Sequence, residues 1–155
     1  MQMGEGYYGR HGTLGIATPQ ANVTAETEFR ALLPRGVACA TVRMASDEPL
    51  PEDRLRAYFS EIGHTLARFD TLAIGAVGLA CTGSSYLLGH AAVEASLAKL
   101  GARRQQPVIS AATAIERALN HIGAHSVALI CPYPEWLLEA AERHWQERGF
   151  ALADR

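Results

Sequence analysis

Short apolar runs alternate along the chain with longer segments of helical periodicity. The apolar runs have the length and composition of buried β-strands, and they cover residues 13–17, 37–42, 72–77, 107–110, 127–131 and 150–153. In the longer segments apolar residues recur three or four positions apart, which predicts helices over 24–33, 52–69, 84–100, 111–122 and 135–148. This alternation predicts an α/β fold, an open and mainly parallel sheet with helices on both of its faces.

Two features of the pattern predict where helices continue and where they end. The apolar residues of 52–69 form a single stripe, so this segment is expected to be one long helix. Gly101, Gly123 and Gly149 each follow a predicted helix, and glycine readily adopts the left-handed conformation that ends one. We therefore expect these glycines to mark three helix ends.

Composition and charge narrow the possible partners. The chain has 155 residues and a net charge of -2, and 48% of its residues are hydrophobic, which excludes a disordered chain. A weakly acidic chain has no basic face to hold a nucleic acid or an anionic membrane, so neither partner is expected. The longest apolar stretch, 72–81, has about half of the roughly 20 residues that a membrane span requires.

The cysteines indicate a reducing compartment. Cys39, Cys81 and Cys131 are odd in number and too sparse for a disulfide scaffold, so we expect a cytoplasmic protein. Residues 1–11 contain no apolar segment of the kind that a signal peptide has. Cys39 and Cys131 are interpreted as packing residues of strands.

No motif indicates a metal or a nucleotide. His121 and His125 are four residues apart, but a glycine lies between them, and the carboxylates do not cluster in the loops, so no metal site is expected. The segment 78–83 has the glycine spacing of a phosphate-binding loop, yet Ser84 stands where that loop requires a lysine. The phosphate-loop interpretation is therefore rejected.

The chemistry that the chain does offer is concentrated after the predicted strand 72–77. Ligands of doubly wound sheets bind beyond the carboxyl ends of the strands. Cys81 lies there, close to the start of a helix, which is a position that favours a thiolate. Thr82, Gly83, Ser84 and Ser85 supply hydroxyl and backbone N–H groups that suit a carboxylate. The alternative is a small buried cysteine followed by an ordinary serine helix cap.

Two other loops offer polar groups at the same edge of the sheet. Asn22 follows the first strand, where it is either a helix cap or, if Thr24 caps the helix, an amide free to donate to a ligand. Tyr133 lies between two prolines after the fifth strand, where it is either a ligand-binding phenol or a surface aromatic residue. In a flavodoxin-like strand order the first and third strands are neighbours, which would bring Asn22 and Cys81 to one crevice.

Taken together, the three loops resemble the aspartate/glutamate racemase superfamily, and within it the group of maleate cis-trans isomerases and arylmalonate decarboxylases. The similarity covers nearly the whole chain. It rests on three motifs in the correct order, which are P-x-x-N-x-T-x-E (Pro19 to Glu26), A-C-T-G-S-S (Ala80 to Ser85) and P-Y-P-E-W-L (Pro132 to Leu137).

The resemblance implies a cofactor-independent enzyme that acts beside a carboxylate of a small dicarboxylate or amino acid. Members have two similar α/β halves, each with one catalytic cysteine. Cys81 matches the cysteine of the first half, Asn22 and Tyr133 match substrate-binding positions, and residues 82–85 match the carboxylate cradle. Decarboxylases of the group typically have glycine where Cys81 stands, so the resemblance favours an isomerase or a racemase over a decarboxylase.

The resemblance also implies that the chain is a flavodoxin-like half of a two-half fold. We expect a flexible N-terminal segment over 1–11, a first α/β domain over 12–122, and the start of a second, incomplete domain over 123–155. A truncated, non-catalytic module that binds carboxylates is the alternative to an enzyme. Association into a homo-oligomer is a further expectation.

Overall fold

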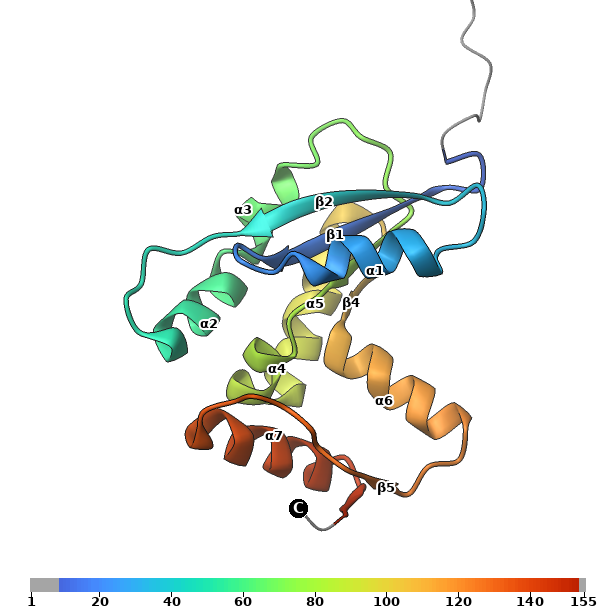
Figure 1. Cartoon of the computed structure of the whole chain (residues 1–155). Helices are drawn as coiled ribbons and strands as arrows, with labels where there is room; N and C mark the ends of the chain where they lie inside the picture. Colours follow the sequence, from blue (N-terminus) through green and yellow to red (C-terminus); the bar gives the residue numbers. More distant parts are fainter. Residues whose placement is uncertain (1–8, 154–155) are drawn as a thin grey trace, which may run out of the picture.

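The computed structural model describes residues 9–153 (Figure 1). Its strands are β1 (Thr13–Pro19), β2 (Ala38–Met44), β3 (Ala76–Leu79), β4 (Val108–Ser110), β5 (Ser126–Val127) and β6 (Ala151–Leu152). Its helices are α1 (Thr24–Leu32), α2 (Pro51–Ser60), α3 (Ile62–Ala67), α4 (Thr82–Leu88), α5 (His90–Arg104), α6 (Ala111–His121) and α7 (Glu135–Glu147).

The first four strands form one parallel sheet in the order β2-β1-β3-β4. β1 is central, so that Gly15 pairs with Ala40 of β2 on one side and with Val77 of β3 on the other. The expected neighbourhood of the first and third strands is thereby confirmed. β5 and β6 form a separate parallel pair, which α7 connects.

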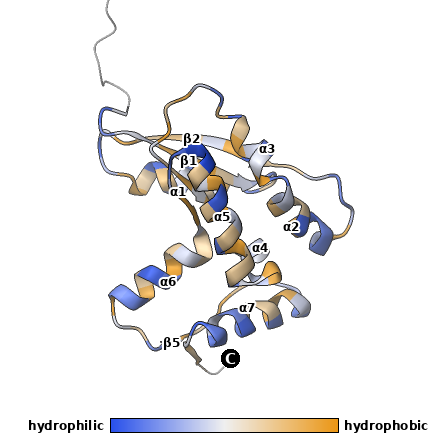
Figure 2. Ribbon diagram, turned by 180° about the vertical axis from the view of Figure 1, so that it is seen from behind, coloured by the Kyte–Doolittle hydropathy of each residue, from blue (hydrophilic) through white to orange (hydrophobic). Residues whose placement is uncertain are grey.

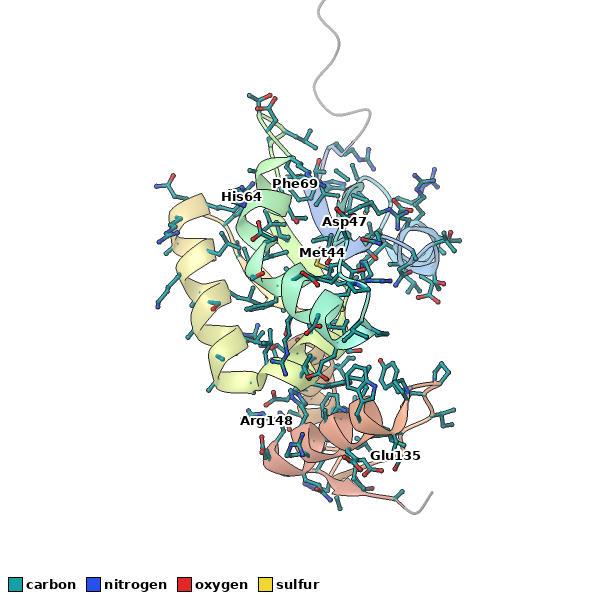
Figure 3. All side chains as sticks on the ribbon, turned by 90° about the vertical axis from the view of Figure 1, so that its left-hand side faces the viewer. Met44, Asp47, His64, Phe69, Glu135 and Arg148 are labelled. Carbon is teal, nitrogen blue, oxygen red and sulfur yellow. The ribbon has the colours of Figure 1, made fainter. Side chains whose placement is uncertain are left out.

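Helices cover both faces of the four-stranded sheet, as predicted. Side chains of α2, α3 and α5 pack on one face in a single apolar core that includes the fully buried Leu66. α1 lies on the opposite face (Figure 1). A Cβ atom on Gly15 would come within 2.9 Å of Cζ of Phe69, so glycine at this position lets the connection after α3 close onto β1 (Figure 3).

The C-terminal elements pack against α4 rather than against the large sheet. α4 contacts α7 and, on its other sides, α2, α5 and α6. Figure 2 shows hydrophobic residues on α4 between α5 and α7, while hydrophilic residues form bands on α2, α6 and α7. This packing fixes the start of α4 between the two parts of the chain.

Two predicted helices are each divided in two. The predicted helix 52–69 is α2 and α3, which meet at Glu61, where ψ of 8° breaks the regular helix. The predicted helix 84–100 is α4 and α5, separated at Gly89 with φ of 81°. The prediction that Gly101 ends this helix was wrong, since α5 continues to Arg104 and Gln105 takes the left-handed conformation (φ 55°). Gly123 and Gly149 do have positive φ, as expected after helices.

The strands β3 and β5 differ most from the apolar runs that predicted them. β3 begins at Ala76, because Ala76 is the first residue paired with β1 and residues 72–75 precede that pairing. β5 ends at Val127, because its partner β6 supplies pairs only to Ser126 and Val127. The apolar residues that follow are not all covered, and Ile130 is 98% exposed.

The ends of the chain are described only in part. The predicted flexible segment 1–11 falls largely outside the described residues, and residues 9–11 form a turn in which the His11 N–H donates to the Gly36 carbonyl at 2.9 Å. The predicted division at 122/123 stays a prediction. Within residues 9–153, no helix has the length and apolarity needed to cross a bilayer.

Candidate functional site

The carboxyl ends of β1 and β3 bring two of the predicted loops to one edge of the sheet. The Ala80 N–H donates to the Ala17 carbonyl at 2.8 Å, which extends the pairing of the two strands one residue beyond the end of β3. Cys81 follows at once, in an extended conformation (φ -146°, ψ 103°) and immediately before α4. The loop of residues 20–23, which contains Asn22, leaves β1 at the same edge.

The thiol of Cys81 is partly buried and is hydrogen-bonded to a serine. Its Sγ lies 3.4 Å from Ser84 Oγ, and Ser84 Oγ donates to the Leu55 carbonyl of α2 at 2.8 Å. A serine hydroxyl has a single proton to donate. Because Ser84 donates it to the Leu55 carbonyl, the Ser84 oxygen accepts the hydrogen bond from the Cys81 thiol. The sulfur is thus connected through one hydroxyl to the backbone of α2.

The remaining residues of the predicted carboxylate cradle lie in the first turn of α4. Ser84 and Ser85 are 4% and 3% exposed, so their side chains are packed inside the protein and do not form an open rim. A Cβ on Gly83 would lie 3.2 Å from Leu55 Cδ1, closer than an ordinary contact, so glycine lets α2 approach α4. The same Cβ would be at an ordinary contact distance of 3.6 Å from Leu137 Cδ2 of α7. The groups of this segment best suited to an anion are therefore the backbone N–H groups of the first turn, which have no partner within the helix.

The third predicted loop reaches the same helix. The Tyr133 hydroxyl lies 3.0 Å from Thr82 Oγ1, across 51 positions of sequence. The Tyr133 ring also meets the ring of Tyr86 edge-on, at 6.5 Å between centroids and an interplanar angle of 68°. The structure thus brings Tyr133 into contact with Thr82, the residue that follows Cys81 in the sequence. In the described residues, Cys131 has no hydrogen bond to Thr82 or to Tyr133.

Asn22 caps α1, which is the first of its two predicted roles. Its Oδ1 accepts from the N–H groups of Thr24 and Ala25, at 2.9 and 3.1 Å. In the alternative left open by the sequence, Thr24 would be the cap, but Thr24 is already inside the helix as its first residue. Capping uses only the side-chain oxygen, so the side-chain NH2 group of Asn22 keeps its capacity to donate.

Sequence reasoning missed the long-range partners of these loops. Arg43 of β2 donates from Nη1 to the Asn22 and Pro19 carbonyls and from Nη2 to Glu26 Oε2. Tyr58 of α2 also interacts with the Cys81 loop. Burial raises the pKa of its phenol, the Arg54 cation lowers that pKa, and the Cys81 side chain raises it further. The partners of Arg43 lie 17 to 24 positions away from it in the sequence, so no local motif could have indicated them.

A buried polar cluster lies outside the site and joins α6 to the end of α7. Glu116 of α6 accepts from Arg148, and its other oxygen lies 3.9 Å from His90 Nδ1. The Arg148 hydrogen bond lowers the pKa of Glu116. Burial lowers the pKa of His144, whose ring is 5.0 Å from that of Tyr86. Within residues 9–153, no group of three His, Cys, Asp or Glu side chains is arranged to hold a metal ion.

Comparison with known proteins gives maleate isomerases and, among the solved structures, also arylmalonate decarboxylases. No profile of a known protein family matches the sequence. A maleate isomerase of Geobacillus stearothermophilus is 29% identical over 160 residues, which cover 94% of this chain and 62% of that protein. The structure of the maleate isomerase Iso from Pseudomonas putida S16 has a TM-score of 0.80 at 21% identity, over 92% of this chain and 62% of that one.

A third relative combines higher identity with structural similarity. The Nocardia farcinica maleate cis-trans isomerase, solved as a cysteine-to-serine variant with a covalently bound succinylcysteine intermediate, has a TM-score of 0.72 at 28% identity, covering 92% of this chain and 61% of that one. The chain thus spans about three fifths of the length of the relatives that it matches. In its strand order, its three loops and these comparisons, the chain is similar to maleate isomerases, as the resemblance to the aspartate/glutamate racemase superfamily led us to expect.

Proposed function

We propose that this chain supplies the nucleophilic cysteine and part of the carboxylate site of a cofactor-independent isomerase that converts a cis-unsaturated dicarboxylate into its trans isomer. The observation that supports the proposal is the contact between Thr82 and Tyr133 at the start of α4, directly after Cys81. Cys81 precedes this helix, Thr82 bonds to Tyr133, and the Asn22 loop leaves the neighbouring strand.

The reaction follows from the chemistry of a thiolate beside a conjugated carboxylate. Cys81 first loses its proton to water, and the Ser84 hydroxyl can then turn its proton from the Leu55 carbonyl to the sulfur at 3.4 Å. The thiolate adds to one alkene carbon, and the electron pair of the double bond moves into the carboxylate at the other carbon. Rotation about the new single bond and expulsion of the thiolate give the trans alkene. No electron is gained or lost overall, so the reaction needs no redox cofactor.

Charge stabilisation is the second requirement of this reaction. The intermediate has additional negative charge on the carboxylate, and N–H and O–H donors directed at that charge lower the barrier. We assign this role to the backbone N–H groups of Thr82, Gly83 and Ser84, to the Thr82–Tyr133 hydroxyl pair and to the Asn22 NH2 group. Ser85 is buried in the same turn, and we propose that it shapes the backbone there rather than binding substrate through its hydroxyl.

The covalent intermediate of the Nocardia relative supports thiol addition over the other reactions of the superfamily. A racemase would use Cys81 to remove the α-proton of an amino acid, and a decarboxylase of this group would typically have glycine in place of Cys81. A non-catalytic carboxylate-binding module stays an alternative, because the chain spans 62% of the length of the Geobacillus isomerase.

The test is to incubate the chain with maleate and to follow fumarate by proton NMR, with Cys81→Ser and Cys39→Ser as a matched pair. We expect fumarate from the wild type and from Cys39→Ser but none from Cys81→Ser. Iodoacetamide should alkylate Cys81 faster than Cys39, whose pKa is raised by burial, and maleate should protect Cys81.

Other results would favour the alternatives. Maleate binding in a calorimetric titration without any fumarate would favour the binding module. Deuterium exchange at the α-carbon of aspartate in D2O, without fumarate from maleate, would favour a racemase. Equal activity of Cys81→Ser and wild type would contradict every version that uses this thiol.

A further inference from the structure

We propose that Arg43 is a positioning residue that holds the Asn22 loop in its substrate-binding conformation. This inference rests on the proposed function, because it assigns Asn22 to the carboxylate of the substrate. Arg43 lies on β2, the edge strand, and does not adjoin Cys81 in the sheet. Its role would be exerted through the loop alone.

The guanidinium of Arg43 contacts three consecutive parts of the segment after β1. Nη1 donates to the carbonyl of Pro19, the last residue of β1, at 3.3 Å, and to the carbonyl of Asn22 in the loop. Nη2 donates to Oε2 of Glu26, in the first turn of α1. One side chain therefore connects the end of the strand, the loop and the start of the helix.

The neighbours of Arg43 on β2 explain why its side chain is available for this role. Val42 and Met44 are buried in the core on the side of α2 and α3, and side chains alternate along a strand. Arg43 therefore extends to the side of α1, where it remains about one third exposed. An exposed ion pair with Glu26 alone would contribute little, so the two carbonyl contacts carry the argument.

The hydrogen bonds of Asn22 show what this clamp fixes. Its N–H donates to the Pro19 carbonyl at 2.9 Å, its carbonyl accepts from Arg43, and its Oδ1 accepts from the N–H groups of Thr24 and Ala25. Among the described residues, the side-chain NH2 is the one polar group of Asn22 with no hydrogen bond to the protein. The remaining bonds fix the orientation in which this NH2 group is presented.

A lysine at position 43 would not reproduce this arrangement. The guanidinium is a planar fork with donors on two separate nitrogens, which is how Arg43 reaches the two carbonyls with Nη1 and Glu26 with Nη2. A lysine ammonium is a single point of charge on a flexible stem. A lysine at position 43 would therefore keep the ion pair with Glu26 but lose the hydrogen bonds to the Pro19 and Asn22 carbonyls.

The test separates loop order from substrate binding. Arg43→Met, Arg43→Lys and Glu26→Gln are compared with wild type and with Arg56→Met, which removes an exposed arginine paired with Glu52 on α2. Hydrogen exchange of the amides of residues 22–25 reports the loop, calorimetric titration with maleate reports binding, and circular dichroism confirms that each variant is folded.

We expect Arg43→Met to speed the exchange of the Thr24 and Ala25 amides and to weaken maleate binding, each by about tenfold, as the loss of a charge-assisted hydrogen bond implies. Arg43→Lys should behave like Arg43→Met, Glu26→Gln should have a smaller effect, and Arg56→Met none. In a turnover assay the loss should appear in KM more than in kcat.

Each other outcome has a definite meaning. Unchanged loop exchange in Arg43→Met overturns the clamp. Faster exchange with undiminished maleate binding overturns the positioning role and leaves Arg43 a structural residue. Full rescue by Arg43→Lys would show that charge suffices and would contradict the fork argument. If wild type does not bind maleate, the proposed function fails, and the exchange data still decide whether Arg43 orders the loop.

Discussion

His144 should make the stability of this protein depend on pH in a range that is set by one buried ring. His144 is 4% exposed and its ring packs edge-on against Tyr86 and Trp145, at 5.0 and 5.1 Å between centroids. In the residues that the structure describes, its Nε2 has no hydrogen-bond partner. Burial disfavours the imidazolium, so the pKa of His144 is lowered from its ordinary value of 6.5.

Charges on three helices modify this effect of burial. His90 of α5 and Arg148 at the end of α7 lower the pKa of His144 further, while Glu116 of α6 and Glu147 of α7 raise it. Glu116 itself has a lowered pKa, so its own contribution to stability is present above its ordinary value of 4.5 and is lost only as the pH falls through its still lower value in the folded state. The two groups therefore act in different pH ranges.

The magnitude follows from proton linkage. Between pH 6.5 and the lower pKa of the folded protein, the unfolded chain binds a proton at His144 that the folded protein does not bind. As the pH falls through this range, the free energy of unfolding falls by at most about 1.4 kcal/mol per pH unit. His144→Phe keeps an aromatic ring in the cluster and removes the titration, so this part of the pH dependence should vanish.

The assay is urea unfolding, followed by circular dichroism, at about pH 7 and about pH 5. The wild type should lose more stability than His144→Phe on acidification, whereas His64→Phe, at a histidine whose side chain is 89% exposed, should behave like the wild type. An identical pH dependence in wild type and His144→Phe would refute the assignment to this ring.

Two further predictions concern the Asn22 cap and the core. Asn22→Asp should weaken maleate binding through repulsion of like charges while changing the melting temperature little, because Asp caps helices as well as Asn does; unchanged affinity in calorimetry would leave Asn22 a cap alone. Leu66→Ala, at a fully buried side chain, should cost about 2–5 kcal/mol in urea unfolding, while Leu32→Ala, at an 82% exposed one, should stay within about 0.5 kcal/mol; equal costs would contradict the assigned core.

The order of strands and helices was predictable because apolar residues recur with the spacing of each element. The apolar runs identified every strand, and the adjacency of β1 and β3 followed from the usual order of such sheets. The ends of strands were less predictable, because a residue such as Ile130 is apolar whether or not a neighbouring strand pairs with it. The break at Glu61 has no local signal in the stripe of apolar residues that runs through it, and Gly89 was a signal that helices also tolerate.

The candidate site was predictable in composition but not in its internal connections. Cys81, Thr82 and Tyr133 followed from loops at the ends of strands, and the structure joins the last two by a hydrogen bond. The bond from Ser84 to the Leu55 carbonyl and the contacts of Arg43 connect residues more than 15 positions apart. Such pairs depend on how helices pack, and a single sequence contains no periodic signal for them.

The bend between α4 and α5 restricts which sequences can share this architecture. Gly89 has φ of 81° and ψ of 148°, a conformation that is open almost only to glycine. An added Cβ would meet no other heavy atom within 4 Å. A larger residue at position 89 is therefore disfavoured by the backbone torsion angles and not by a clash with a neighbouring side chain. A smaller neighbouring side chain would not relieve this backbone strain, so we expect substitutions at position 89 not to be neutral. A descendant that lost this glycine would need a different path for the chain between α4, which begins directly after Cys81, and α5.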